Sequence, residues 1–155
     1  MKYARLSKEQ FEELHKEFIN FLATQSITSE EWQDIKLNKP EVAEQELDVF
    51  SDLVWEGVLG KVEYIEHISP KQMHLFKLME NGMHLIAINI KIDIDITTTE
   101  GYKWLQNNLM DDAVEFLQAN KDYSEDKNLD KFKLIQEGGA ITKGQLYNYF
   151  DNIIN

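Results

Sequence analysis

The spacing of hydrophobic positions changes twice along the chain and predicts helices, then strands, then helices again. In the first third, apolar residues recur three or four positions apart, as they do along one face of a helix. In the middle they alternate with polar residues, which is the period of a half-buried strand. Helical spacing returns in the last third. This order of elements predicts an α+β fold.

Three helices are predicted before the strands. Ser7 with Gln10 forms a capping box ahead of the first helix. Thr28 with Glu31 repeats the pattern for the second helix. A proline suits the first turn of the third, which we expect over residues 40–59. The apolar face of the first helix comprises Phe11, Leu14, Phe18 and Leu22.

The middle of the chain predicts a three-stranded antiparallel meander. Residues 61–68 and 73–79 form the first two strands, joined by a turn that contains Pro70. Asn81-Gly82 suits a two-residue type I′ turn, which would place Leu78 opposite Leu85.

In the third strand, isoleucines alternate with other residues from Ile86 to Ile96. Its far end, from Ile92 to Ile96, then outruns the second strand. This leaves an unpaired edge unless the chain bends or a helix covers it, and we expect that end to be covered, or to be augmented by another chain.

Four further helices are predicted in the last third. Threonines before Glu100 begin one, and Asp111 caps another that runs through Val114, Phe116 and Leu117. The remaining two begin at caps formed by Ser124 and by Thr142 with Gln145. The last helix is expected to turn Leu146, Tyr149, Phe150 and Ile153 inward. With no linker-like segment between the elements, we expect a single α+β domain over residues 1–155.

The negative net charge of the chain argues against two classes of partner, nucleic acids and anionic membranes. Sixteen basic and 28 acidic residues give a net charge of −12 and a pI near 4.7. Contact with nucleic-acid phosphates or with an anionic membrane surface requires a basic face. Direct binding to nucleic acid or membrane is therefore not expected. The chain has no cysteine, no apolar leader and no apolar run of membrane-spanning length, which together predict a cytoplasmic location.

The predicted helix over residues 40–59 divides into an apolar half and an acidic half. Ala43, Leu47, Phe50, Val54 and Val58 form the apolar stripe. On the other half the acidic residues surround a tryptophan, a residue type favoured as an anchor in protein interfaces. This half is either a solvated surface, with the tryptophan covered by a neighbouring helix, or a docking surface for a basic partner. The residues predicted to bind that partner are Glu44, Asp48, Asp52, Trp55 and Glu56.

Two carboxylate patterns are weak candidates for metal sites. Asp93 and Asp95 lie two apart on the predicted third strand and would share a face, but no further ligand pattern completes a site. Glu12 and His15 have the Glu-x-x-His spacing of half a di-iron site, without a second helical copy. A charged strand and a surface pair are the simpler interpretations. We therefore predict no metal.

The histidines and the glycine-rich stretch give no stronger signal. In the predicted hairpin register His74 and His84 fall on opposite faces, and His67 has no predicted partner. The stretch "GGAITKGQ" has the residue types of a phosphate loop in the wrong order, and suits a helix end followed by a cap. No catalytic residue and no cofactor are predicted.

Several segments together resemble a known family. They are "FINFLATQSIT", "QELDVFSDLVWEGVL", "GYKWLQ", "YSEDKNLDKF" and "ITKGQLY", and they span nearly the whole chain. The chain is similar to a family of small, uncharacterised bacterial cytoplasmic proteins with a domain of unknown function. The resemblance implies a cytoplasmic location and brings no activity, ligand or site residue.

We therefore expect a non-enzymatic protein–protein interaction module, an adaptor or accessory subunit that docks on a larger and locally basic assembly. The alternative is a small-molecule-binding or metal-dependent enzyme that uses carboxylates from the sheet. A deep pocket ringed by acids and a histidine would favour the enzyme, and a flat acidic patch with an exposed aromatic residue would favour the module. The sequence leaves the oligomeric state and the identity of the partner open.

Overall fold

The computed structural model describes residues 1–155, which form two compact units, Met1–Gly60 and Lys61–Asn155. Each unit contains its own cluster of buried hydrophobic residues. The fold is α+β, as the sequence predicts, with seven helices and a five-stranded antiparallel sheet. No helix combines the length and the apolar character needed to cross a membrane. The expectation of a single domain stays a prediction.

The first unit is helical and packs around aromatic side chains. Its helices are α1 (Lys8–Glu13), α2 (His15–Thr24), α3 (Ser29–Asn38) and α4 (Pro40–Lys61), the last residue of which belongs to the second unit. The capping box of Ser7 with Gln10 and the cap of Thr28 on Glu31 both form as predicted. The buried centre of the unit consists of Leu6, Phe18, Leu22 and Phe50, with Phe11, Phe21 and Trp32 packed around it.

The first predicted helix is divided in two at Leu14. This residue caps both α1 and α2, and its backbone angles lie outside the helical region. The rings of Phe11 and Phe18, on either side of the break, each lie within contact of Phe50, at centroid distances of 6.0 and 5.0 Å. The prediction of one continuous helix was therefore wrong at Leu14, while the apolar face assigned to it does pack in one cluster.

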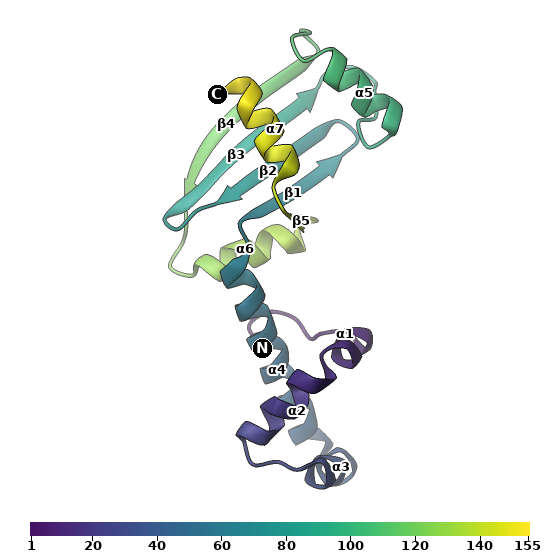
Figure 1. Ribbon diagram of the computed structural model, residues 1–155, viewed down its shortest axis with the longest axis vertical. Helices are drawn as coiled ribbons and strands as arrows, with labels where there is room; N and C mark the ends of the chain where they lie inside the picture. The colour runs from purple at the N-terminus through teal and green to yellow at the C-terminus, as the bar shows by residue number, and fades with distance from the viewer. The chain divides into compact units, whose positions relative to one another are not determined.

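The second unit is built on a five-stranded antiparallel sheet in the order β4-β3-β2-β1-β5, drawn in the upper part of Figure 1. The prediction of a three-stranded meander was incomplete, because β1, β2 and β3 form its centre and two further strands flank them. The strands are β1 (Tyr64–Ser69), β2 (Gln72–Leu78), β3 (Gly82–Ile90), β4 (Val114–Asp122) and β5 (Ala140–Thr142).

One face of this sheet is covered by α5 (Thr99–Asn107) and α7 (Gln145–Ile154); Figure 1 shows α7 lying across it. We call this the covered face. Alternate residues of β2 and β3 point into the core between sheet and helices. Leu105 from α5 and Phe150 from α7 are fully buried in that core. The sheet residues of this core are Met73, Leu75, Ile86, Ile88, Ile90 and Val114.

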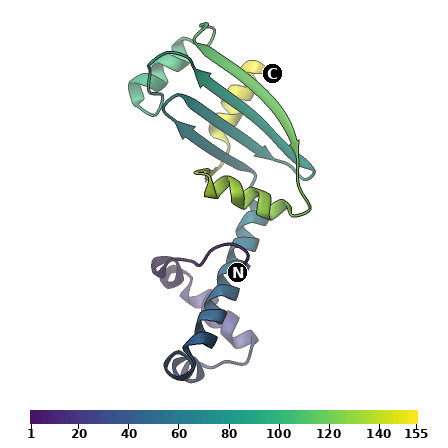
Figure 2. The ribbon, with the colours of Figure 1, turned by 180° about the vertical axis from the view of Figure 1, so that it is seen from behind.

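The opposite face carries α6 (Lys127–Gln136) at one end, as seen from behind in Figure 2. Leu134 and Ile135 of this helix pack on the strand residues there. Lys131, although only 2 % exposed, satisfies its ammonium group partly by donating a 3.1 Å hydrogen bond to the carbonyl of Val62. We call the sheet surface that faces away from α5 and α7 the open face.

The predicted register of the second hairpin was wrong by two residues. Leu78 pairs with Met83 rather than Leu85, and Glu80 with Asn81 forms the turn. Neither Asn81 nor Gly82 has a positive φ, so the turn is not of type I′. Because the slip is an even number of residues, every side chain keeps its predicted face. His74 and His84 accordingly lie on opposite faces, as predicted.

The third strand ends at Ile90, well before the predicted Ile96. The chain bends away at Lys91, which bonds through its amide to Ala113, and it continues as a loop that returns Ile96 to the core. Because of this bend, residues 92–96 do not form the unpaired strand edge that the predicted register implied. β4 pairs with the whole of β3 and takes its place as the edge.

The helix predicted after Asp111 was also wrong, since residues 114–122 form β4. Two later caps shift: Asp126 rather than Ser124 caps α6, and Gly144 in the left-handed conformation precedes α7 while Thr142 belongs to β5. α7 consequently presents a different face to the core. Tyr147 is buried, whereas Tyr149 and Ile153, predicted to face inward, are 36 % and 41 % exposed.

Candidate docking site on the acidic face of helix α4

The acidic half of α4 holds an irregular segment of the same chain, Lys2–Leu6, which bends at Tyr3 and which we call the strap. The carboxylate of Asp52 accepts hydrogen bonds from the backbone amides of Lys2 and Tyr3, at 2.8 and 2.9 Å. Beside it, the Ser51 hydroxyl accepts a 3.1 Å hydrogen bond from the amide of Leu6. Side chains of α4 therefore satisfy strap amides that have no place in a helix or sheet.

Arg5 forms the charged centre of this contact. Its guanidinium lies 2.6 Å from the carboxylate of Glu44 and 2.7 Å from that of Asp48. These two acids are spaced one helical turn apart, so they face the same side of α4. The hydrogen bonds to Glu44 and Asp48 raise the pKa of Arg5 above its already high value. Arg5 is thus held by two carboxylates at once.

At the other end of the strap, Glu56 accepts a hydrogen bond from the Tyr3 hydroxyl and lies 3.6 Å from the Lys2 ammonium. Burial, and then the hydrogen bond to Glu56, raise the pKa of the Tyr3 hydroxyl. Tyr3 and Leu6 are 8 % and 6 % exposed, so the strap contributes apolar surface as well as charge. The contact between the strap and α4 therefore has both polar and apolar parts.

All five residues predicted to bind a basic partner bind the strap. Glu44, Asp48, Asp52 and Glu56 hold its amides and basic side chains, and the indole Nε1 of Trp55 donates a 3.1 Å hydrogen bond to the carbonyl of Ala4. The sequence also implied that Trp55 lies outside the protein's own core. That was wrong in part, because the ring is half-buried and packs against the aromatic centre of the first unit.

The site also contains Ser51 and the strap residues, which the pattern of α4 does not predict. Ser51 is fully buried on α4 and, besides accepting from Leu6, donates a 2.7 Å hydrogen bond to the carbonyl of Leu47. The strap combines basic with apolar residues in Lys2, Tyr3, Arg5 and Leu6. This mixture is the one sequence feature that indicates a segment able to bind an acidic helix face.

A groove with a cavity volume of about 470 Å³ lies beside the strap in the first unit. Its walls include the rings of Phe11, Phe18 and Trp32. Arg5 and Leu6 of the strap also line it. Any movement of the strap therefore changes the groove, and the acidic face and the groove belong to one surface.

The carboxylate patterns do not combine into metal sites. Asp93 and Asp95 lie in the loop after β3 rather than on a strand, with Asp93 fully exposed and 3.7 Å from the Lys71 ammonium. Asp95 instead accepts hydrogen bonds from the amide and the hydroxyl of Thr97, and these bonds lower its pKa. No group of three or more His, Cys, Asp or Glu side chains is placed to hold a metal ion.

The break at Leu14 separates Glu12 from His15, so the predicted Glu-x-x-His pair spans two helices. His67 and His74 are direct partners across β1 and β2 on the open face, a pairing the sequence did not reveal. His84 lies on the covered face and forms a hydrogen bond with the hydroxyl of Tyr147. Burial raises the pKa of that hydroxyl to about 12.

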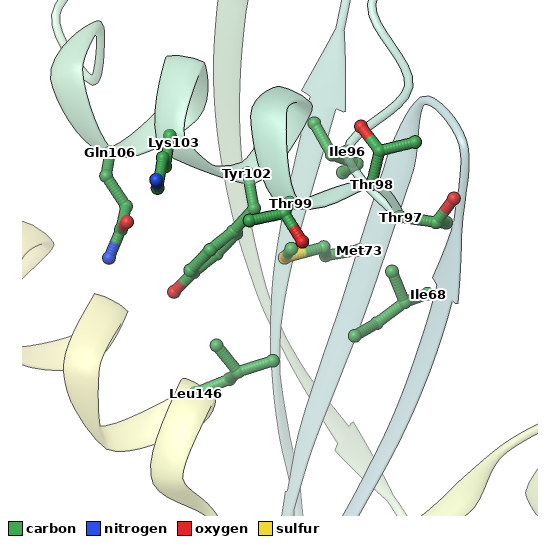
Figure 3. A pocket seen from close by; sticks show the side chains of 10 residues that line it. All are labelled: Ile68, Met73, Ile96, Thr97, Thr98, Thr99, Tyr102, Lys103, Gln106 and Leu146. Carbon is green, nitrogen blue, oxygen red and sulfur yellow. The ribbon is translucent and has the colours of Figure 1, made fainter.

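The second unit has an open pocket of about 570 Å³ at the beginning of α5 (Figure 3). Tyr102, Lys103 and Gln106 reach into it from α5, and Leu146 of α7 lies opposite them. Its remaining lining is Ile68, Met73, Ile96, Thr97, Thr98 and Thr99. The lining contains neither an acid nor a histidine, so it lacks the arrangement that would favour the enzyme alternative.

The fold and the site together define a small acidic α+β protein whose longest helix holds a basic segment of its own chain. The chain belongs to the family described as a family of unknown function, DUF6495, which matches residues 1–155. The part of the resemblance that concerns an uncharacterised family of unknown function is thus confirmed, and no activity comes with it.

More distant similarity links the chain to archaeal proteins. Three curated relatives from Saccharolobus islandicus, strains M.14.25, M.16.27 and Y.G.57.14, each bear the name "Putative HTH-type transcriptional regulatory protein". Each is 29% identical over 119 residues, a match that covers 68% of this chain and 34% of the relative. The chain thus spans about a third of the length of these relatives. No solved structure matches the chain.

Proposed function

We propose that this protein is a non-enzymatic interaction module that binds a basic, non-helical segment of a partner protein on the acidic face of α4. The observation that carries the proposal is the strap, since the same five residues predicted from the sequence already hold a basic, non-helical segment of this chain. A surface that binds one peptide of this chemistry can bind another of the same chemistry when the first is displaced.

The strap specifies what the partner segment resembles. Its backbone must bend at the position of Tyr3, as the strap does, so that two successive amides reach Asp52. A basic residue must meet Glu44 and Asp48, an aromatic residue must fill the place of Tyr3, and an apolar residue must fill that of Leu6. Arginine is better suited than lysine at the charged position, because its planar group reaches two carboxylates.

Displacement of the strap is energetically feasible. Its ion pairs are partly exposed, and such pairs contribute roughly 0–1 kcal/mol each. The burial of Tyr3 and Leu6 is the larger contribution, at about 1.5–3 kcal/mol for a fully buried large side chain. A partner segment that replaces both apolar contacts matches the strap in contacts but must also overcome the high effective concentration of a segment of the same chain. Additional contacts in the neighbouring groove would supply that difference.

The enzyme alternative relied on the carboxylates of Asp93 and Asp95, which lie in the loop after β3 and not on the sheet. The name of the archaeal relatives suggests a role beside nucleic acid. We propose that any such role is indirect, through a basic protein, because a net charge of −12 opposes contact with phosphates. The proposal also retains a bacterial origin and a cytoplasmic location, consistent with a chain free of cysteine.

A labelled peptide with the sequence of residues 1–7, "MKYARLS", tests the proposal by fluorescence polarisation. We expect the Tyr3→Ala/Arg5→Ala protein, whose own strap is weakened, to bind the peptide at least about tenfold more tightly than the wild type. Added salt should weaken this binding, since the contact is between opposite charges. Introducing Asp48→Lys and Asp52→Lys into the weakened-strap protein should abolish it.

The matched control places Glu13→Lys and Glu17→Lys in the same weakened-strap protein. Both residues are exposed in the first unit and lie away from the strap contacts, and the change in net charge is the same. The control should bind the peptide normally. Absence of binding to the weakened-strap protein, or equal loss in the control, would refute recognition by the acidic face.

A further inference from the structure

The sheet of the second unit ends on one side in a long and accessible edge. β4 has nine residues, and from Leu117 to its end every one is exposed. In Figures 1 and 2, β4 forms the outer margin of the sheet, and no other strand or helix runs along its outer side. The other edge strand, β5, has only three residues. Long unprotected edges are sites where a further strand can add to a sheet.

The hydrogen-bonding pattern shows which backbone groups of β4 are available. The amide of Lys91 donates to the carbonyl of Ala113, its direct partner across β3 and β4. Bonded pairs recur at every second residue in an antiparallel ladder, so the odd-numbered residues of β4 bond to β3. The even-numbered residues point their amides and carbonyls away from the sheet. These are Val114, Phe116, Gln118, Asn120 and Asp122.

The side chains of β4 are complementary to a second, antiparallel copy of the same strand. A two-fold axis at Gln118 pairs even-numbered residues with even-numbered ones, which matches the free backbone groups. It also places Glu115 opposite Lys121 of the other copy, twice by symmetry. Positions directly opposite at non-bonded pairs have the closest side chains, about 4.5 Å apart at Cα. Opposite charges at such positions stabilise the pairing.

Apolar contacts accompany this charge pairing. The same axis places Leu117 opposite Ala119 of the other copy, between the two charged pairs and on the open face. Leu117 is 49 % exposed in the single chain. The Gln118 side chain does not obstruct the edge, because it exchanges hydrogen bonds of 3.3 and 3.0 Å with the Asn155 side chain at the end of α7.

We propose that two copies of this protein associate through β4, antiparallel and centred on Gln118, and so join their sheets into one. The proposal is independent of the docking function, which uses the first unit. A continuous sheet would bury the exposed leucine and satisfy ten free backbone positions, five from each copy. The charges at positions 115 and 121 fix the register.

Sedimentation analysis of the full chain tests the proposal. We expect the wild type to approach twice the 18.2 kDa of one chain as its concentration rises. Gln118→Pro should give a folded monomer, because the lost amide points outward and proline is tolerated at such edge positions. Gln118→Ala keeps the amide and should still associate. A wild type that stays at 18.2 kDa, or association that survives Gln118→Pro, would overturn the proposal, as would a monomeric Gln118→Ala.

Charge reversal gives a second test of the pairing through β4, which applies even if the proline variant does not fold. Lys121 has no ion pair within its own chain, so Lys121→Glu should weaken association at least about tenfold by facing Glu115 of the other copy. Adding Glu115→Lys should restore it. The restoring variant also carries Lys91→Glu, because Lys91 lies 3.3 Å from Glu115 in the same chain. Failure of the restoration, with the fold intact, would exclude this register.

Discussion

The indole Nε1 of Trp55 donates a 3.1 Å hydrogen bond to the backbone carbonyl of Ala4, across 51 positions of sequence. One face of the tryptophan ring thus belongs to the aromatic centre of the first unit, while its polar edge holds the strap. Trp55 therefore both packs within the first unit and holds another segment, whereas the pattern of α4 presented a covered ring and a docking ring as alternatives. A variant that removes only the hydrogen bond measures its contribution separately from that of the packing.

Replacing Trp55 by phenylalanine should keep most of the packing and remove only the hydrogen bond. We expect Trp55→Phe to lower the free energy of unfolding by about 1 kcal/mol, the net contribution of an ordinary hydrogen bond. Trp55→Ala should lower it by about 3 kcal/mol, since an aromatic side chain is lost from a packed site. Urea unfolding followed by circular dichroism measures both. Equal stabilities of Trp55→Phe and the wild type would show that the bond contributes nothing.

Replacing Ser51 should reduce the stability of the protein more than replacing an exposed serine does. Its fully buried hydroxyl accepts from the Leu6 amide and donates to the Leu47 carbonyl. Ser51→Ala leaves the strap amide without an acceptor, and we expect a loss of about 1–3 kcal/mol in unfolding free energy. Ser29→Ala, at an exposed serine on α3, is the matched control and should change stability by less than about 0.5 kcal/mol. Similar losses in the two variants would contradict the role of Ser51.

Replacing two helical glycines by alanine should change the stability of the protein in opposite directions. A Cβ at Gly57 of α4 would meet no atom within 4 Å, so Gly57→Ala should stabilise the protein by about 0.5–1 kcal/mol through helix propensity. A Cβ at Gly101 of α5 would lie 1.8 Å from the carbonyl oxygen of Asp95, which forces the loop before α5 to move. Gly101→Ala should therefore destabilise the protein. Thermal unfolding of the two variants beside the wild type gives both signs in one experiment.

The carboxyl of Glu66 should make stability depend on pH. It lies half-buried on the covered face of β1, and burial raises its pKa. The folded state thus binds the Glu66 proton more tightly than the unfolded state, and stability is lost as pH rises from the unfolded pKa, about 4.3, through the higher folded value.

Glu66→Gln should consequently be more stable than the wild type at pH 7, by less than about 1 kcal/mol because the group stays partly solvated. This advantage should shrink toward pH 4, where the wild-type carboxyl becomes protonated. Urea unfolding at both pH values measures the difference. The exposed Glu125, changed to glutamine, should show no such trend, and a constant advantage of Glu66→Gln across the range would argue against desolvation as its cause.

The sequence by itself determined features that depend on neighbours along the chain. The capping box at Ser7, the cap at Thr28 and the beginning of α4 at Pro40 all lie where local hydrogen bonding and backbone preference place them. The first hairpin is similarly local, with Pro70 in its turn. The division of α4 into apolar and acidic halves also follows from helical geometry, and the acidic half contains the residues that contact the strap.

The tertiary structure decided the features that depend on a distant partner. Residues 114–122 become a strand because β3 offers them a complete ladder of backbone hydrogen bonds, which no local pattern records. The side chains of Phe11 and Phe18, on either side of the break at Leu14, find their common partner in Phe50, far along the chain. The occupant of the acidic face is the strap because Arg5 and the strap amides meet Asp48 and Asp52 only after the chain has folded back. Helical periodicity fixes which side of α4 is acidic, whereas long-range packing selects what that side binds.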